Sequence, residues 1–156
     1  MAKRVIQGLK GLQALVGQHL GTSSWVTVTQ ERIDAFAAGT GDFQWIHCDP
    51  ARCRTQSPYG TTVAHGFLTL SLCNCMVQEI FEIEGVQMIL NYGVNRVRFP
   101  APVRVGSRVR MSCDLAALKE TRGSVQATFK QSFEVEGESK PACVAETVVR
   151  IFFADP

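Results

Sequence analysis

The stretch from His65 to Ile80 constrains the fold more than any other part of the chain. Placed on a helical wheel, its apolar residues cover nearly the whole circumference: Phe67, Leu68, Leu70, Leu72, Cys73, Cys75, Met76, Val77 and Ile80. A helix that is apolar on all sides is a buried helix. At about 1.5 Å per residue it would run roughly 22 Å, which suits the centre of a small domain. The sequence therefore predicts one long central helix that other elements must cover.

The chain after Gly85 has the pattern of β-strands. Four stretches rich in Val, Phe, Thr and Met are separated by turn-forming residues, and they cover Gln87–Phe99, Ser107–Lys119, Ser124–Val135 and Cys143–Phe153. Strands joined by tight turns indicate an antiparallel sheet. With a short strand at Ser24–Val28, the pattern predicts about five strands. One buried helix and one antiparallel sheet make an α+β domain.

The N-terminal half has weaker signals. Residues 11–16 are predicted to form a short amphipathic helix. Thr29 is a good N-cap for a helix from Gln30 to Ala38. The stretch from Asp42 to Thr62 is expected to be mostly loop, with a brief helix after Pro50. A chain of 156 residues has room for one domain, so residues 1–156 are predicted to fold as a single unit.

Charge and cysteine content exclude several classes of protein. The net charge of +2 is too small to indicate nucleic acid as a partner. The longest uncharged stretch, Gly60–Gln78, contains His65 and Asn74, so it indicates a buried helix and not a membrane span. The basic start of the chain lacks the apolar core of a signal peptide. The six cysteines lack zinc-site spacing, and buried, reduced thiols in a cytoplasmic protein are expected.

Two of the three histidines, His47 and His65, lie in the loop-rich stretch before the predicted central helix. Asp42 precedes His47 by five residues, which suggests the two ends of a curved loop, since a spacing of three or four would stack them on a helix. An Asp and a His directed at one point can activate a water molecule as an acid–base pair. Such a pair is also common as a local hydrogen bond or cap, and the residues alone leave both interpretations open.

Ala64-His65-Gly66 lies at the start of the predicted helix. The N–H groups of a first helical turn have no acceptor within the helix and carry partial positive charge. Because Gly66 has no side chain, a ligand oxygen could approach its N–H closely, as in an oxyanion hole. The alternative is that Gly66 only allows the helix to pack closely against the sheet.

These segments together resemble a known motif. The sequence Gly41-Asp-Phe-Gln-Trp-Ile-His47, followed by Asp49-Pro50 and Val63-Ala-His-Gly-Phe-Leu-Thr69, resembles the hydratase motif of the MaoC-like dehydratases, the (R)-specific enoyl-CoA hydratases. Gln44 and Trp45 stand where Asn and Pro are usual. Residues 44–47, with 91–99 downstream, resemble the nodulation protein N-like branch. The resemblance covers roughly Val26 to Val109.

The resemblance implies a hot-dog fold, in which an antiparallel sheet wraps a long central helix. It also implies reversible hydration of a trans-2-enoyl-CoA to an (R)-3-hydroxyacyl-CoA. By this resemblance, Asp42 and His47 position and activate the water and deliver a proton to C2, and the Gly66 N–H polarises the thioester oxygen. The acyl-CoA is then the substrate, with no metal and no other cofactor. Asn74 stands where some relatives carry a supporting serine.

Two other functions fit such a domain. An acyl-CoA thioesterase of the hot-dog fold also uses a carboxylate, but typically without the loop that carries Asp42 and His47. A non-catalytic acyl-thioester-binding protein would keep the pocket without the chemistry.

Three further expectations concern the surroundings of the site. The basic residues of segment 96–122 could face the phosphates of coenzyme A or form a solvated strand face. Trp45 could line a channel or pack the loop. Because one sheet around one helix leaves its edge strands open, and because hot-dog domains commonly pair, a homodimer is expected.

Overall fold

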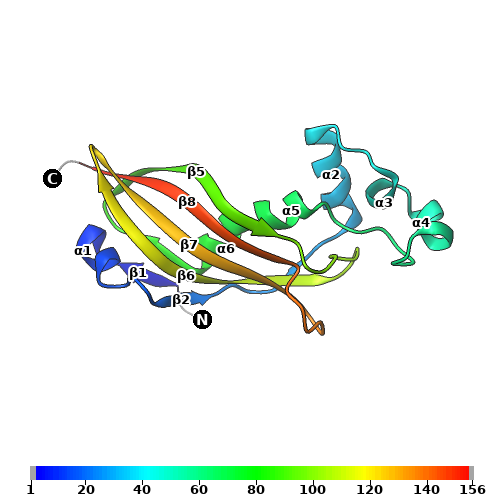
Figure 1. Ribbon diagram of the computed structural model, residues 1–156, viewed down its shortest axis with the longest axis horizontal. Coiled ribbons are helices and arrows are strands. Elements are labelled where there is room, and N and C mark those ends of the chain that lie inside the picture. The colour runs from blue at the N-terminus through cyan, green and yellow to red at the C-terminus, as the bar shows by residue number, and fades with distance from the viewer. Residues whose placement is uncertain (1–2, 155–156) are drawn as a thin grey trace.

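The computed structural model describes residues 3–154, and residues 1–2 and 155–156 of the expected domain lie outside this range. A long curved sheet holds a helical segment on its inner side, and further helices form a lobe at one end (Figure 1). The helices are α1 Gly8–Gln13, α2 Gln30–Thr40, α3 Trp45–Cys48, α4 Pro50–Gln56, α5 Gly66–Ser71 and α6 Cys73–Ile80. The strands are β1 Arg4–Ile6, β2 His19–Thr22, β3 Val26–Thr27, β4 Phe81–Ile83, β5 Val86–Arg98, β6 Arg108–Thr121, β7 Ser124–Val135 and β8 Cys143–Phe153.

The main sheet has six strands. Its order is β2-β6-β7-β8-β5, with β3 also paired to β6, and every pairing in it is antiparallel. The four long strands match the predicted ones closely, and β2 is the strand that the sequence did not indicate. A separate parallel pair, β1 with β4, was also not predicted. Strand β5 lies at one edge of the main sheet.

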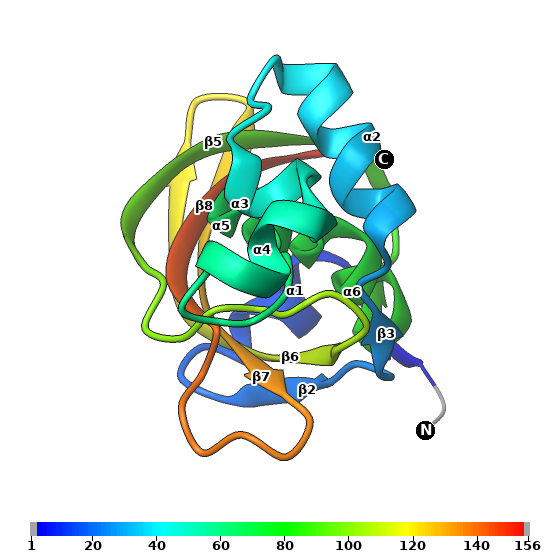
Figure 2. The same ribbon diagram turned by 90° about the vertical axis from the view of Figure 1, so that its right-hand side faces the viewer.

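The core lies between the sheet and the helices α5 and α6. Alternate residues of β7 are buried: Val125, Ala127, Phe129, Gln131, Phe133 and Val135. Facing them, Leu68, Leu72, Met76 and Ile80 recur every four residues and form one buried stripe along α5 and α6. Seen from the end, the sheet curves around these two helices (Figure 2). This architecture is the hot-dog fold, as the resemblance implied.

The prediction of a single helix buried on all sides was wrong in two respects. The helical path is interrupted at Leu72, so that α5 and α6 replace one continuous helix. Only one face is buried, and Phe67 on the other face is 64% exposed. The physical reason is that the sheet wraps the helices from one side, and within one chain nothing covers their outward apolar residues. The sequence pattern shows where the apolar side chains lie on the helix. It does not show that the sheet covers only one side of the helix.

Within the N-terminal half, helices α2, α3 and α4 form the lobe that carries the motif. Helix α2 begins as predicted, with the Thr29 hydroxyl accepting a hydrogen bond from the Arg32 N–H, and it ends two residues later than predicted, at Thr40. Gly41 follows with φ +78°, a left-handed conformation that suits glycine. The brief helix after Pro50 is confirmed as α4. Helix α3 is a correction, because this segment was expected to be loop, and α1 begins three residues earlier than predicted.

All six cysteines are free thiols. Cys53, Cys113 and Cys143 are buried, whereas Cys75 is exposed, so the expectation of burial was wrong for Cys75. Burial raises the pKa of Cys113 and of Cys143 to about 12, which keeps both thiols protonated and unreactive. Within residues 3–154, no helix combines the length and the apolar character that a bilayer crossing requires.

Gly21 in β2 gives a direct test of this packing. A Cβ at this position would lie 2.7 Å from Ile80 Cγ2 at the end of α6, and its φ of +151° is rarely adopted by other residues. We expect Gly21→Ala to destabilise the fold by about 1–3 kcal/mol, measured by urea unfolding. Gly39→Ala is the matched control, because a Cβ there meets open space in helix α2, and it should be neutral or stabilising. Equal stabilities of the two variants would contradict the packing described.

Candidate active site

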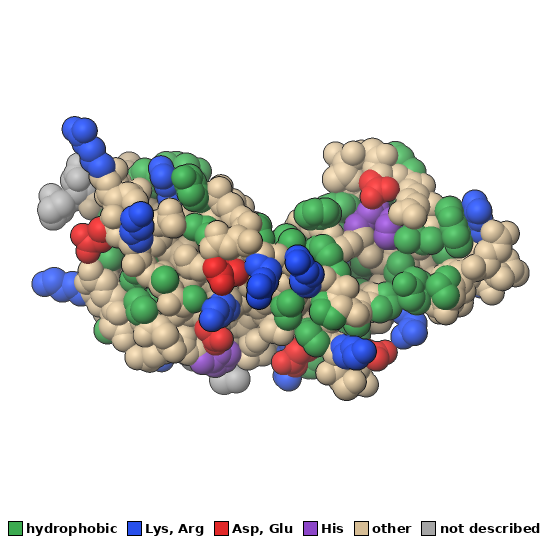
Figure 3. All heavy atoms as spheres, viewed as in Figure 1, with side chains coloured by type: hydrophobic (Ala, Val, Ile, Leu, Met, Phe, Trp, Pro, Cys, Tyr) green, Lys and Arg blue, Asp and Glu red, His purple; other side chains and the backbone are tan. Residues whose placement is uncertain are grey.

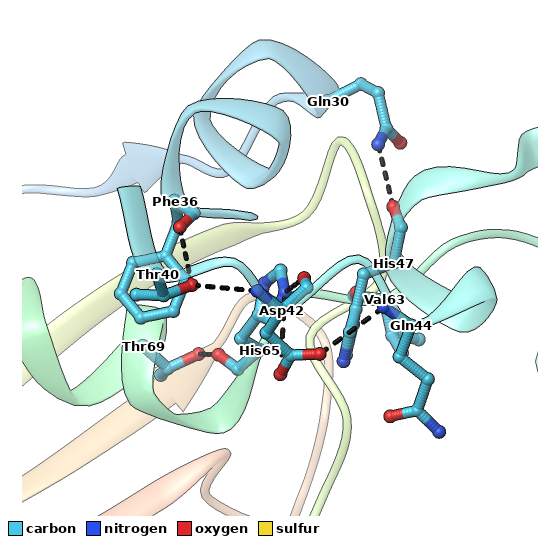
Figure 4. A network of polar contacts seen from close by, with 9 residues as sticks. All are labelled: Gln30, Phe36, Thr40, Asp42, Gln44, His47, Val63, His65 and Thr69. Carbon is cyan, nitrogen blue, oxygen red and sulfur yellow. Dashed lines mark hydrogen bonds and ion pairs between the residues drawn. The ribbon is translucent and has the colours of Figure 1, made fainter. Parts of the chain in front are cut away.

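The lobe formed by α2, α3 and α4 brings Asp42, His47 and His65 together. One polar side-chain atom from each of the three residues lies within 4.8 Å of the others. In the space-filling view, acidic and histidine side chains adjoin on this lobe, beside the hollow that separates it from the sheet (Figure 3). The close-up shows Asp42 facing the two imidazole rings (Figure 4). The sequence predicted that Asp42 and His47 would meet, and the structure adds His65 to the pair.

Asp42 is positioned by the end of helix α2. It follows Gly41, where the chain turns out of the helix, and its Oδ1 accepts a hydrogen bond of 3.3 Å from the Gln44 N–H. Its side chain is 55% exposed, so the carboxylate faces the opening of the site. It is therefore held from one side and open to a substrate or water on the other.

His47 lies on helix α3 and is buried, with 7% of its surface exposed. Its Nδ1 lies 2.6 Å from the Val63 carbonyl oxygen. Because a carbonyl can only accept, Nδ1 carries the proton, and in the neutral ring Nε2 keeps its lone pair. Burial lowers the pKa of His47, the charge of His65 lowers it further, and the Val63 hydrogen bond and Asp42 act in the opposite direction. The net effect favours the neutral imidazole, which is the form a general base needs.

His65 caps the start of α5 and supports the other two residues. Its ring stacks on His47 with centroids 3.8 Å apart, and Phe36 packs on it at 5.0 Å. Its Nε2 donates to the backbone carbonyl oxygen of Asp42 at 2.9 Å. This bond fixes the backbone of Asp42, and the stacking fixes the plane of His47. The Ala-His-Gly motif signalled His65, but sequence reasoning assigned it no role of its own.

Gln30 joins three parts of the site and was missed in the sequence. Its Nε2 donates to the His47 carbonyl oxygen at 2.8 Å, and its Oε1 accepts from the fully buried Thr62 hydroxyl at 2.6 Å. The side chain therefore ties the start of α2 both to α3 and to the segment that leads into α5. A glutamine in the first turn of a helix has no distinctive sequence signal, because its partners are 17 and 32 residues away.

Gly66 opens helix α5 directly after His65. A Cβ built on it would lie 2.9 Å from the Phe99 ring, so the residue permits close packing between helix and sheet. This observation supports the packing explanation for the glycine. The predicted use of its N–H as an oxyanion donor is compatible with that packing, because the N–H belongs to the unpaired first turn of α5.

The geometry of the two histidines bears on metal binding. Asp42, His47 and His65 are close enough to offer three ligand atoms to one ion. However, an imidazole lone pair lies in the plane of its ring, and these planes are nearly parallel, with an interplanar angle of 27°. Two stacked rings cannot both direct a lone pair at one ion about 2.0–2.1 Å away. The arrangement favours a hydrogen-bonded water over a chelated metal.

Other residues singled out in the sequence lie outside this cluster. The Arg52 guanidinium stacks over Trp45 at 4.3 Å, which favours the interpretation that Trp45 packs the loop. Asn74 and Asn91 line a cavity between α6 and β5. Three arginines of the basic segment pair with glutamates at 2.8–3.2 Å, as expected for a solvated strand face: Arg104 with Glu138, Arg108 with Glu136 and Arg110 with Glu134.

The environment of His47 predicts its titration. Its pKa should lie below the ordinary value of 6.5, measured from its ring chemical shifts by NMR. Because the folded-state pKa is the lower one, the unfolded chain takes up this proton first as the pH falls. The corresponding stability is complete above about pH 6.5 and is lost as the pH falls through the folded-state pKa.

His65→Phe tests how the neighbouring imidazole contributes to the pKa of His47. It retains an aromatic ring against His47 but removes the electrostatic effect of the second imidazole, which lowers the pKa of His47, so this pKa should rise. A pKa at or above 6.5 in the unmodified protein would contradict the burial argument.

We compared the sequence and the structure with those of known proteins, and the matches fall in one family. Residues 12–136 match the model of the MaoC-like domain. The chain is 49% identical over 148 residues to 3-hydroxyacyl-thioester dehydratase Z of Mycobacterium tuberculosis, covering 94% of this chain and 97% of that protein. It is 43% identical over 150 residues to nodulation protein N of Rhizobium leguminosarum bv. viciae, covering 95% of this chain and 92% of the relative.

A solved structure agrees with these matches. The (R)-hydratase from A. caviae involved in PHA biosynthesis superposes with a TM-score of 0.69 at 28% identity, covering 86% of this chain and 94% of that one. The fold, the family model and the relatives agree, and the chain belongs to the MaoC-like dehydratase family.

Proposed function

We propose that this protein is an (R)-specific enoyl-CoA hydratase, which adds water reversibly to a trans-2-enoyl-CoA to give an (R)-3-hydroxyacyl-CoA. The observation that carries the proposal is the Val63–His47 hydrogen bond, which leaves Nε2 of a buried, neutral imidazole free beside the Asp42 carboxylate. Membership of the MaoC-like dehydratase family supports it. The similarity to a 3-hydroxyacyl-thioester dehydratase and to an (R)-hydratase supports it as well.

The proposed reaction assigns one role to each group. Asp42 and His47 hold a water molecule and remove its proton as its oxygen forms a bond to C3. The electrons of the C2–C3 double bond then move toward C2 and the thioester carbonyl, where the Gly66 N–H stabilises the enolate oxygen. Asp42 and His47, the catalytic dyad, then deliver the proton to C2. One water has thereby been added, and both side chains return to their starting protonation states. General acid–base catalysis of this kind contributes typically about 10²–10⁴-fold.

We propose that this chemistry needs no metal and no cofactor beyond the coenzyme A of the substrate. The dyad activates the water, and the helix start stabilises the negative charge, so each demand of the reaction has a group of this chain assigned to it. We also place the protein in the cytoplasm, where free thiols such as those observed are maintained.

We further propose that the working unit is a homodimer. Strand β5 is an edge strand of the main sheet, and it exposes a band of large apolar side chains that an isolated chain would leave in water: Met88, Ile89, Leu90, Tyr92 and Val94. Phe67 on the outward face of α5 is exposed as well. A second copy that covers this edge would bury both groups beside the start of α5.

Variants of the dyad test the proposed function. With crotonyl-CoA, Asp42→Asn and His47→Ala should each lower kcat by about 10²-fold or more, because water activation is lost. The matched controls are Asp114→Asn and His19→Ala, since this second His–Asp pair, joined at 2.7 Å, lies exposed between β2 and β6. The controls should retain full activity, and a chelator should leave the rate unchanged. Near-full activity in either dyad variant would show that the assignment is wrong.

The same assay separates the other candidate functions. Loss of the absorbance of the conjugated thioester without release of free thiol indicates hydration. Release of thiol would instead indicate a thioesterase. Neither change would indicate a protein that binds acyl thioesters without reacting.

The dimer is tested by sedimentation velocity. The unmodified protein should sediment at about twice the chain mass of 17.1 kDa. Leu90→Glu places a charge in the apolar band of β5 and should shift the protein toward the monomer. Val16→Glu is the control, because Val16 is a similarly exposed apolar residue (43% against 46%) that lies outside β5. An active monomer at assay concentration would disprove the proposed dimer.

A further inference from the structure

The cavity that Asn74 and Asn91 line lies between helix α6 and the sheet. It has a volume of about 610 Å³, within the usual range of sites for small molecules. Its walls come from α5 and α6 on one side and from β5, β7 and β8 on the other. Much of its lining is apolar, including Val77, Phe81, Phe129 and Ile151. Asp42, His47 and Gly66 are not among its lining residues, so it is distinct from the catalytic cluster.

One polar residue interrupts the apolar row that faces this cavity. On β7, every second side chain is buried toward the helices, and Phe129, Gln131 and Phe133 belong to this row. Phe129 and Gln131 both line the cavity. Gln131 is only 5% exposed, and its Oε1 is buried with no hydrogen-bond partner in residues 3–154. A buried carbonyl oxygen without a donor is unfavourable, and native structures contain few of them. This atom therefore points to a ligand.

The neighbours of Gln131 determine which kind of group would satisfy it. On β6, its register partner is Cys113. On β8, its register partner is Ala145, which has no polar side chain. The atom of Gln131 that lacks a partner is the amide oxygen, which only accepts hydrogen bonds. Its ligand must carry a donor, and among groups compatible with an apolar chain, a hydroxyl fits.

Further polar groups lie on the same walls. Asn91 on β5 is the register partner of Val149, and both residues line the cavity. Thr147 on β8 and Asn74 on α6 line it as well. A cavity for a plain alkyl chain needs none of these groups, because each loses hydrogen bonds with water when such a chain covers it.

The cavity is placed to receive the far part of an acyl chain. Its lining begins at Leu70, four residues after Gly66 along α5, which is about 6 Å at the rise of an α-helix. If the thioester carbonyl of the substrate binds at the Gly66 N–H, the entrance of the cavity therefore lies about one helical turn away from it.

From this we infer that the protein selects acyl thioesters that carry a hydroxyl group far from the thioester, separate from the hydroxyl formed at C3, and that Gln131 recognises it. This inference rests on the proposed hydratase function. It makes Gln131 a residue that determines specificity and takes no part in the chemical step.

The test compares ten-carbon trans-2-enoyl-CoA with the same thioester hydroxylated at the sixth, eighth or tenth carbon. We expect kcat/KM to be about 10-fold higher for one of the hydroxylated chains, as one additional hydrogen bond allows. In Gln131→Met, which keeps the length of the side chain, the ratio should fall to about one. Gln126→Met is the control, because Gln126 lies on the same strand among the residues that alternate with the buried row, and it should keep the ratio.

The outcomes separate this inference from the proposed function. If crotonyl-CoA is hydrated but every ten-carbon chain reacts equally well, the inference is wrong and the hydratase stands. If no enoyl-CoA reacts, the hydratase proposal fails, and binding of the saturated thioesters decides about the cavity. Tighter binding of a hydroxylated decanoyl-CoA than of decanoyl-CoA supports the hydroxyl site, and equal affinity overturns it. These measurements on the unmodified protein decide the matter even if Gln131→Met does not fold.

Discussion

The packing of one helical stripe against a curved sheet underlies everything else in this structure. Leu68, Leu72, Met76 and Ile80 fill the inner side of the sheet, and at about 25 cal/mol per Å² such burial is the main favourable contribution to folding. This packing fixes where α5 begins, and hence where Gly66 and His65 lie. It also leaves the opposite face of the helices, with Phe67, open. The same interaction thus builds the core and leaves the surface at which the proposed second chain binds.

The catalytic lobe depends on polar contacts more than on burial. The carbonyl of Val63 sets the tautomer of His47, and the carbonyl of Asp42 accepts from His65. Gln30 then holds α2 against α3 through the backbone of His47. Backbone carbonyls are well suited to this purpose, since they cannot donate and so select one tautomer of each neutral ring. The result is a base with a defined free nitrogen beside a carboxylate that is held at its backbone.

Each of the two polar regions of the molecule contains a buried atom without a partner. In the catalytic cluster, the Val63 carbonyl fixes the proton on Nδ1 of His47, whereas Nδ1 of His65 has no hydrogen-bond partner in the described part of the chain. In the cavity beneath α6, the same holds for Oε1 of Gln131. Native structures contain few buried polar atoms of this kind. In the proposed complex, the first atom lies near the reacting end of the substrate and the second near its distal end.

The sequence by itself determined the class of fold, the four long strands and the residues of the motif. Each of these depends on local signals: the alternation along a strand, the capping of α2 by Thr29, and the spacing of Asp42, His47 and Gly66. The resemblance to a family added the hot-dog fold, which the structure confirms. Such signals are readable because they arise from residues close together in the chain.

Only the tertiary structure decided which sides of the helices are covered, that α5 and α6 are separate, and that His65 stacks on His47. It also decided that Gln30 reaches Thr62, and that Gln131 lies buried without a partner. These features join residues far apart in sequence, and their energies depend on which atoms meet after the chain has folded. No local pattern encodes the direction from which a sheet wraps a helix, and for that reason the cavity and its polar lining became visible only in the folded molecule.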